Sequence, residues 1–249
     1  MPLGNANPLS KTRSSNSWFR RQDSCSESRT PKPFIARGTP YAEGCTLPSI
    51  AVVDYVVGNL LSVKKALETV GASTCVTRST RDLEQADAIV LPGVGAFRDA
   101  QENLRKLTPA VLQHIESGKP LLGICLGLQL LFTESTEGGT YKGLDYFKGK
   151  VVRLPGDVKV PHMGWNTLDI IQEANPFVEG LSSGIYVYFV HSYYGEAAER
   201  RDMVAETEYG VRFPSILSRG CVYTTQFHPE KSGKVGLRLL ENFVDIVRR

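Results

Sequence analysis

The sequence has no hydrophobic run long enough to cross a membrane, few cysteines and little net charge. Its longest mainly apolar run, residues 121–132, is shorter than the roughly 18 residues that a spanning helix needs. The five cysteines are odd in number and form no CxxC pair, which argues against a disulfide framework and a metal site and favours the reducing cytoplasm. A net charge of +3 is too small for a nucleic-acid-binding protein unless the charge is clustered. What is left is an ordinary globular composition, with 41% hydrophobic and 22% charged residues.

The first 48 residues differ from the rest of the chain. They carry seven basic and three acidic residues, are rich in Ser and Pro, and show no helical or alternating apolar pattern. We predict a mostly disordered extension at residues 1–48, with a plastid transit peptide as the alternative. No apolar core of a secretory signal is seen there, so secretion is not expected. Residues 49–249, with 22 basic and 23 acidic residues, are predicted to form one folded domain.

Within the predicted domain, short apolar runs alternate with segments of helical periodicity. This alternation implies right-handed crossovers and an α/β fold, with a mainly parallel sheet and helices on both faces. Asn59 is expected to cap the first helix, Gly71 to end it, and a later helix to carry His114 on a solvated face. Two β-rich segments, residues 185–190 and 221–227, are predicted to add antiparallel strands to the same sheet. The predicted parallel strands are residues 50–53, 74–77, 88–91 and 121–124, and the predicted helices are residues 59–70, 108–117, 127–132 and 235–247.

Residues 123–127, Gly-Ile-Cys-Leu-Gly, have the pattern of a nucleophile elbow between a strand and a helix. Small residues at Gly123 and Gly127 permit the sharp turn that lifts Cys125 out of the sheet. The N-terminus of the following helix offers free backbone N–H groups and the positive end of its dipole, and both favour the thiolate, which is the reactive form of cysteine. The alternative is a buried and inert cysteine, which is the commoner case for a single cysteine.

A second candidate is His228-Pro229-Glu230, which follows the β-rich residues 221–227. Side chains two residues apart in an extended chain point the same way, and the proline favours an extended conformation at His228. Glu230 is then placed to orient the imidazole and to stabilise its cation, as the third member of a catalytic triad does. The alternative is a surface turn with an incidental ion pair. Cys125 and His228 need to be close only in space, as two strand ends of one sheet are.

The third candidate is the turn Pro-Gly-Val-Gly at residues 92–95, after a predicted strand. Glycines let a backbone turn its N–H groups towards an oxyanion, so Gly93, Val94 and Gly95 are candidates for oxyanion binding. An ordinary glycine turn is the alternative. An elbow together with a distant His-x-Glu pair is much more specific than either part alone.

These residues resemble the class I, or triad, glutamine amidotransferases, and the resemblance extends from about residue 49 to residue 249. The segments GICLGLQ and QFHPE are similar to motifs of the whole class. Four others are similar to the histidine-pathway branch, the glutaminase subunits of imidazole glycerol phosphate synthase. One departure is Val56, where the family usually has glycine. The branch-specific segments are PGVGAF at 92–97, VPHMGWN at 160–166, YFVHSYY at 188–194 and PEKS at 229–232.

The resemblance implies a flavodoxin-like α/β fold and a thioester mechanism without a cofactor. It implies that Cys125 attacks the side-chain carboxamide of glutamine, that His228 moves the proton and that Glu230 holds His228. The oxyanion is implied to bind backbone N–H groups of Leu126 and of residues 93–95. For two of the implied glutamine-site residues, His191 and Tyr193, packing at a strand end is an equally good interpretation of the sequence. The residues implied to line or flank that site are Gln129, His191, Ser192 and Tyr193.

The resemblance also implies a partner, a cyclase subunit with a (β/α)₈ barrel, either as a separate chain in a heterodimer or on the same polypeptide. That cyclase takes up the ammonia and converts a phosphoribulosyl-formimino aminoimidazole carboxamide ribonucleotide into imidazole glycerol phosphate. Family members have low glutaminase activity until the cyclase is occupied, so we expect a peptide of the oxyanion hole to reorient, with the Val94 N–H as the switched donor. Two alternatives stay open: an amidotransferase that serves another acceptor, and a catalytically silent scaffold that only binds a partner.

Overall fold

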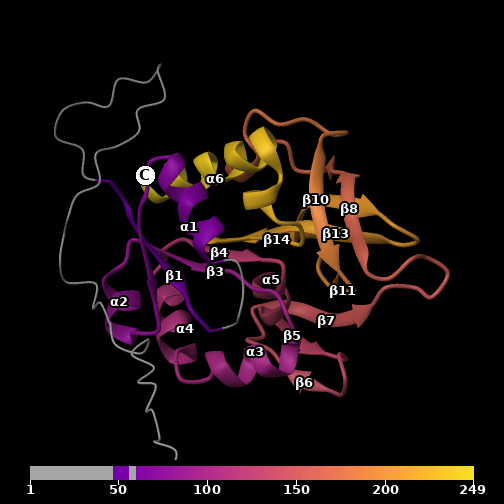
Figure 1. Ribbon diagram of the computed structural model, residues 1–249, viewed down its shortest axis with the longest axis horizontal. Coiled ribbons are helices and arrows are strands. Elements are labelled where there is room, and N and C mark those ends of the chain that lie inside the picture. Colours follow the sequence, from indigo (N-terminus) through magenta and orange to yellow (C-terminus); the bar gives the residue numbers. More distant parts are fainter. Residues whose placement is uncertain (1–46, 56–59) are drawn as a thin grey trace, which may run out of the picture. The chain divides into compact units, whose positions relative to one another are not determined.

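The structure is a computed structural model that describes residues 47–55 and 60–249 (Figure 1). The predicted disordered extension lies almost wholly outside the described residues, and so do Asn59, the expected helix cap, and Val56, the departure from the family pattern. Within the described ranges, no helix is long and apolar enough to cross a bilayer. The same ranges contain no group of three or more His, Cys, Asp or Glu side chains that could hold a metal ion.

The centre of the fold is an eight-stranded mixed sheet in the order β2-β1-β3-β4-β14-β13-β12-β9. The first five strands in this order are parallel, and each of the last three is antiparallel to the strand before it. The central strands β3, β4 and β14 are buried along their whole length, as a sheet covered on both faces requires. The bounds are β1 Ser49–Val53, β2 Ser73–Thr77, β3 Ala88–Leu91, β4 Leu121–Ile124, β9 Asp169–Ile170, β12 Met203–Glu208, β13 Arg212–Arg219 and β14 Val222–Thr225.

Helices cover both faces of this sheet, and the side chains of β1 alternate between the two cores. Ile50 and Val52 belong to the core that α1 and α6 close, whereas Ala51 and Val53 belong to the core that α2, α3 and α4 close. Figure 1 shows α1 and α6 together on one side of the parallel strands and α3 and α4 on the other. The predicted α/β class is therefore confirmed. The helices are α1 Leu60–Thr69, α2 Thr80–Gln85, α3 Phe97–Leu104, α4 Thr108–Glu116, α5 Leu126–Leu130 and α6 Gly233–Val247.

Two smaller sheets contribute to the region of the candidate site. One pairs β8 with β10, and the other has the order β11-β7-β5-β6. The chain passes from the first to the second at Ser192, between the end of β10 and the start of β11, so three predicted site residues lie at this crossing. The bounds are β5 Phe132–Ser135, β6 Tyr141–Lys142, β7 Phe147–Arg153, β8 His162–Thr167, β10 Tyr186–His191 and β11 Tyr193–Ala197, with short 3₁₀ turns at Pro176–Val178, Arg200–Asp202 and Pro229–Lys231.

Two sequence predictions about the C-terminal strands are wrong. β14, predicted as an added antiparallel strand, runs parallel to β4 and is antiparallel only to β13. β10, predicted in the same sheet, pairs with β8 in a separate one. A β-rich composition indicates that a segment is extended, but strand pairing depends on packing against distant neighbours. Because β12, β13 and β14 reverse direction in turn, β14 reaches β4 in the parallel sense.

Two smaller predictions also need correction. The helix predicted at residues 127–132 ends earlier, because Phe132 already begins β5. His114, predicted on a solvated face, is 3% exposed, since positions 110, 111 and 114 share the helix face that packs into the core. Its Nε2 lies 3.2 Å from the Pro120 carbonyl oxygen. Burial lowers the pKa of this histidine.

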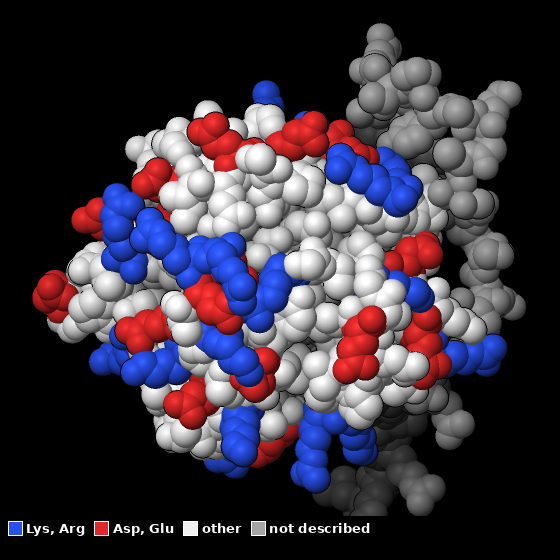
Figure 2. Space-filling model, turned by 180° about the vertical axis from the view of Figure 1, so that it is seen from behind, with Lys and Arg blue, Asp and Glu red and all other residues white. Residues whose placement is uncertain are grey.

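Basic and acidic side chains are mixed over the face shown in Figure 2. Close pairs of opposite charge recur among the described residues. Arg212, for example, lies within 4 Å of carboxylates of Asp169, Glu206 and Glu208. Exposed pairs of this kind add little to stability, because water screens the charges. The described part of this face therefore has no broad surface of one sign, such as nucleic-acid-binding proteins use.

Candidate active site

Cys125 lies at the corner between β4 and α5, where the sequence predicts a nucleophile elbow. Its backbone has φ 54° and ψ −103°, outside the regions that non-glycine residues usually adopt. Such strain costs about 1–3 kcal/mol and is concentrated at functional sites. The flanking glycines leave no space for a side chain: a Cβ on Gly127 would lie 1.8 Å from the Leu91 carbonyl oxygen, and one on Gly123 would lie 3.0 Å from that of Gly127. The elbow therefore holds a buried free thiol in a strained and sterically fixed position.

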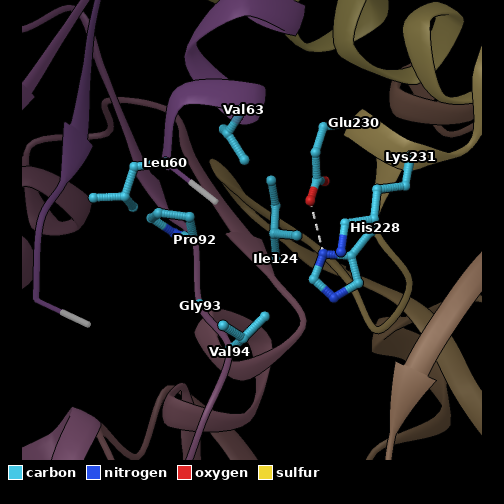
Figure 3. Close-up of a pocket in the computed structure, with 9 residues that line it drawn as sticks. All are labelled: Leu60, Val63, Pro92, Gly93, Val94, Ile124, His228, Glu230 and Lys231. Atoms are coloured by element: carbon cyan, nitrogen blue, oxygen red, sulfur yellow. Dashed lines mark hydrogen bonds and ion pairs between the residues drawn. The ribbon is translucent and has the colours of Figure 1, made fainter. Parts of the chain in front are cut away.

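His228 and Glu230 form a buried pair near this elbow. His228 follows β14, which is paired in register with β4, so the histidine and Cys125 come from neighbouring strand ends. Nδ1 of His228 lies 2.8 Å from Oε1 of Glu230, and the two side chains are 3% and 2% exposed. Figure 3 shows both at a pocket that Gly93 and Val94 also line. The distance fits the orienting role predicted for Glu230.

The electrostatics of His228 couple it to the cysteine. Burial lowers the pKa of His228, but the sulfur of Cys125 and the carboxylate of Glu230 together raise it to about 10. Its Nε2 is buried and has no hydrogen-bond partner among the described residues. A sulfur nucleophile, an adjacent imidazole and a carboxylate behind that imidazole are the groups that acyl transfer through a covalent intermediate requires.

The predicted oxyanion loop presents a carbonyl group to the elbow. The backbone N–H of Leu126 donates to the carbonyl oxygen of Gly93, at 3.4 Å. This approach requires glycine, because a Cβ at position 93 would lie 2.9 Å from the Tyr55 hydroxyl oxygen and 3.0 Å from Cβ of Leu126. Gly95, at φ 113°, also has a conformation that side chains disfavour. One donor that the resemblance assigns to the oxyanion is thus occupied by the protein itself.

A second pocket shares Val94 with the first and contains Cys125. The two adjoining pockets together bring in every site residue that the sequence predicts. His191 and Tyr193 line the second pocket and also contact one another, since Nδ1 of His191 lies 2.9 Å from the Tyr193 carbonyl oxygen. Both interpretations of these two residues, pocket lining and strand-end packing, therefore apply. The predicted residues in the second pocket are Val94, Gly95, Cys125, Leu126, Gln129, His191, Ser192 and Tyr193.

Three residues at or beside these pockets are not among those predicted from the sequence. Glu137 lines the second pocket, and its Oε2 accepts the backbone N–H of Phe97 at 2.8 Å. Gln226 donates to the sulfur of Cys125 at 3.7 Å, and His162 hydrogen-bonds a residue that lines the pocket. Gln226 and His162 both lie in segments that resemble family motifs, so a signal for them was present. Glu137 lies outside those segments and gave none.

We expect acid to destabilise the protein through its buried neutral histidines. Burial lowers the pKa of His191 to about 3 and that of His162 to about 4, from 6.5 in the unfolded chain. Between these values and 6.5 the unfolded chain binds protons that the native protein does not, so the free energy of unfolding falls as the pH falls. Each histidine contributes up to about 1.4 kcal/mol per pH unit. His228 acts in the opposite sense near pH 6.5 and above, where its raised pKa keeps the native protein protonated while the unfolded chain loses the proton. Below about pH 5.5 both states are protonated and His228 adds little to the slope.

Denaturant unfolding from about pH 5.5 to about pH 4.5 measures this slope. In a His162→Phe variant, the slope of the free energy of unfolding against pH should decrease by the contribution of one histidine. An unchanged slope in that variant would contradict the neutral state assigned to His162.

This chain is similar to known proteins both in sequence and in fold. The family "Glutamine amidotransferase class-I" matches residues 51–247. "Imidazole glycerol phosphate synthase subunit HisH" of Archaeoglobus fulgidus is 56% identical over 201 residues, which cover 80% of this chain and 100% of that protein. The protein of the same name from Syntrophotalea carbinolica is 52% identical over 206 residues, which cover 79% and 100%. A solved structure of PurLQS from Thermotoga maritima covers 81% of this chain and 99% of its own, with a TM-score of 0.66 at 19% identity, which shows the fold alone.

Proposed function

Because this chain belongs to the class-I glutamine amidotransferases, in their branch of HisH subunits of imidazole glycerol phosphate synthase, we propose that it hydrolyses glutamine for such a synthase. The products are glutamate and ammonia, and the ammonia supplies nitrogen to the imidazole ring in histidine biosynthesis. The observation that carries the proposal is the buried pair of His228 and Glu230, coupled to the sulfur of Cys125 at a strained elbow. We place the reaction in the cytoplasm, where a nucleophilic thiol stays reduced.

Cys125 is the nucleophile of the proposed reaction. Its sulfur bonds to the side-chain carbonyl carbon of glutamine, and negative charge develops on the oxygen. The thiol proton passes to His228 before the sulfur attacks, in keeping with the raised pKa of His228, and His228 gives it to the leaving nitrogen as the C–N bond breaks, so ammonia departs and a thioester remains. Water then attacks the thioester with His228 as base, which releases glutamate and restores the thiol. Glu230 accepts the N–H of Nδ1 at 2.8 Å and so keeps Nε2 available to the sulfur.

The second pocket is the proposed binding place of glutamine. Cys125 and Glu137 both line it, so one negative side chain is available to the ammonium group of an amino acid near the nucleophile. Ser192 and the neighbouring backbone supply neutral hydrogen-bonding groups. Gln129 is already engaged, because its Nε2 donates to the Tyr193 carbonyl oxygen at 2.8 Å. We therefore assign Gln129 to the framework of the pocket.

Activation requires the oxyanion loop to rearrange. In the structure, the N–H of Leu126 donates to the Gly93 carbonyl oxygen and is not free to bind an oxyanion. Rotation of the peptide between Gly93 and Val94 would withdraw this oxygen, release the Leu126 donor and turn the N–H of Val94 towards the site. One rotation thus supplies two donors for the oxyanion. We propose that an occupied cyclase favours the rotated state, which fits the low basal activity implied by the resemblance.

Val94→Pro tests this switched donor, because proline has no backbone N–H. We expect the partner-stimulated rate of glutamate release to fall about 10²- to 10³-fold, the usual cost of one oxyanion donor. Val94→Ala keeps the N–H and is the matched control, with a rate close to that of the unaltered protein. Equal stimulated rates in the two variants would remove Val94 from the oxyanion hole.

The sheet of β8 and β10 carries the proposed docking surface for the cyclase. The ring centres of Trp165 and Tyr188 lie 6.0 Å apart, and Nζ of Lys231 lies 6.0 Å from the centre of the Tyr188 ring. Lys231 also lines the pocket of His228, so a partner on this surface borders the place where ammonia forms (Figure 3). Exposed aromatic side chains beside a pocket are typical anchors of an interface. The large apolar side chains exposed on this sheet are Met163, Trp165 and Tyr186, at 62%, 55% and 59%.

Glutamate release in three mixtures tests the proposed function: the protein with glutamine, with added cyclase subunit, and with the cyclase and its ribonucleotide substrate. We expect the third mixture to be the fastest and to form imidazole glycerol phosphate. Trp165→Ala should raise the cyclase concentration that gives half-maximal stimulation. An absence of stimulation, where a known pair of subunits works, would refute the proposal. Glutamate release that only another acceptor enzyme stimulates indicates a different amidotransferase, and cyclase binding without glutamate release indicates a silent scaffold.

A further inference from the structure

We propose that a chain of hydrogen bonds between buried polar groups positions the sulfur of Cys125, and that His162 acts through this chain as a positioning residue. His162 lines neither of the two pockets, so it has no direct contact with the glutamine site described above. The inference rests on the proposed function only in taking Cys125 as the nucleophile. The chain runs from β8 to the elbow through Asn166, His162, His191, the Tyr193 carbonyl group, Gln129 and Gln226.

The inner half of the chain ends on the sulfur. Gln226, which is completely buried, donates from Nε2 to Sγ of Cys125 at 3.7 Å. Its Oε1 accepts from Nε2 of Gln129 at 3.2 Å, and the same Nε2 donates to the Tyr193 carbonyl oxygen at 2.8 Å. Both protons of the Gln129 amide are therefore used. This arrangement fixes the amide of Gln226 with its oxygen towards Gln129 and its N–H towards the sulfur.

The outer half of the chain connects the same carbonyl group to β8. The Tyr193 oxygen lies 2.9 Å from Nδ1 of His191, whose Nε2 lies 3.0 Å from Nδ1 of His162. Nε2 of His162 lies 3.3 Å from Nδ2 of Asn166. Asn166 is in turn anchored, since its Nδ2 also donates to the Glu208 carbonyl oxygen at 3.1 Å. The chain is thus continuous from an anchored amide on β8 to the nucleophile.

A single set of proton positions satisfies all these contacts. A carbonyl oxygen only accepts, so the proton of His191 is on Nδ1 and its Nε2 has a lone pair. His162 must then donate from Nδ1, which leaves its own Nε2 to accept from Asn166. A proton added to either ring would place two donors face to face. Burial lowers the pKa of both rings and thereby preserves this order.

The surroundings of His162 allow its packing and its hydrogen bonds to be tested separately. Its ring centre lies 3.9 Å from that of Tyr209 and 4.7 Å from that of Phe189, with both rings stacked on it. Phenylalanine at this position keeps the stacking but leaves the buried Nε2 of His191 without a donor. Asparagine places an amide N–H close to the position of Nδ1, so it keeps the bond to His191 and loses the stacking.

The rate at which iodoacetamide alkylates Cys125 tests the proposal, followed on the full chain by peptide mass spectrometry without glutamine or partner. We expect His162→Phe to slow alkylation about 10- to 100-fold, because a displaced nucleophile loses reactivity steeply. His162→Asn should stay within about threefold of the unaltered protein, because it restores the donor to His191. The kcat for glutamine should fall in the same order. A role in packing alone predicts the reverse order, with His162→Asn the slower variant.

Two further variants complete the design. His114→Phe makes the same substitution in a buried histidine that contacts Pro120 and lies outside the chain, so it should leave alkylation unchanged. Asn166→Leu leaves the buried Nε2 of His162 without a donor, so the ring is free to move its proton to Nε2 and to lose the donor that faces His191. Alkylation should then slow, which keeps the test decisive if the His162 variants fail to fold. The reverse order of the two His162 variants, or unchanged alkylation in His162→Phe and in Asn166→Leu, would overturn the proposal. A protein that alkylates in the expected order but releases no glutamate would instead overturn the proposed function.

Discussion

Replacement of Cys125 by alanine is expected to reduce glutamine-dependent glutamate release by about 10⁴-fold or more. Without the sulfur no thioester forms, and only oxyanion binding and proximity remain to accelerate the reaction. Alanine keeps the Cβ atom, so the backbone strain at φ 54° and the packing of the elbow stay as they are. The loss should therefore be chemical and not a failure to fold. The measurement is glutamate release with the cyclase and its ligand present, where the rate of the unaltered protein is highest.

The matched control is Cys221→Ala. The thiol of Cys221 donates to the Ile115 carbonyl oxygen at 3.5 Å, away from both pockets, so this variant should keep the unaltered rate. Cyclase binding by Cys125→Ala should also be unchanged, because the sulfur is buried and unavailable to a partner surface. Retained glutaminase activity in Cys125→Ala would refute the assignment of the nucleophile. Loss of cyclase binding would show that the substitution had disturbed the fold.

The three residues of the proposed triad could be located from the sequence because short-range geometry constrains each of them. The pattern around Cys125 reports a steric need, since side chains at positions 123 and 127 would meet backbone atoms. The pairing of His228 with Glu230 was predicted from their spacing of two in an extended segment. The 2.8 Å contact is present, but only His228 is extended, because Pro229–Lys231 forms a 3₁₀ turn that brings Glu230 to the ring. Neither inference needs the rest of the fold. Cys125 and His228 come together because each follows a strand of the same sheet, and these strands, β4 and β14, are neighbours.

The hydrogen-bond chain behind the site was not predictable in this way. His162 meets His191 because β8 and β10 pair antiparallel in a register that sets these two residues opposite one another. Register is decided by the faces that the whole fold buries, which a local pattern does not contain. The sequence predicted β10 in the main sheet, and from that position no argument brings His162 to His191.

The orientation of the peptide between Gly93 and Val94 could not be predicted from the sequence, for a different reason. Glycine at position 93 gives the loop its freedom and its close approach to Leu126, and both follow from the residue type. In the proposed switch, which side of the peptide faces the elbow depends on an equilibrium that the occupied partner shifts. The composition of the loop therefore predicts the candidates, Gly93, Val94 and Gly95, whereas the hydrogen bond from Leu126 to the Gly93 oxygen identifies the orientation present.

Gly127→Ala is expected to lower the free energy of unfolding by about 3 kcal/mol or more, at the upper end of the cost of overpacking. The added Cβ would lie 1.8 Å from the oxygen and 2.8 Å from the carbon of the Leu91 carbonyl group. These are backbone atoms of β3, so no side chain can rotate away, and either the strand or the first turn of α5 must move. For a domain of this size the midpoint of thermal unfolding should fall by about 6–12 °C.

Gly156→Ala is the matched control, because a Cβ at Gly156 would meet nothing within 4 Å. That variant should unfold at the same temperature or slightly higher, since alanine restricts the unfolded chain more than glycine does. Any shift of α5 also moves Cys125 and Leu126 with it, so Gly127→Ala should lose glutamate release well below its new midpoint of unfolding. Normal activity together with normal stability in Gly127→Ala would mean that the contact with Leu91 relaxes easily. The strained backbone of Cys125 would then need a different support from the one described here.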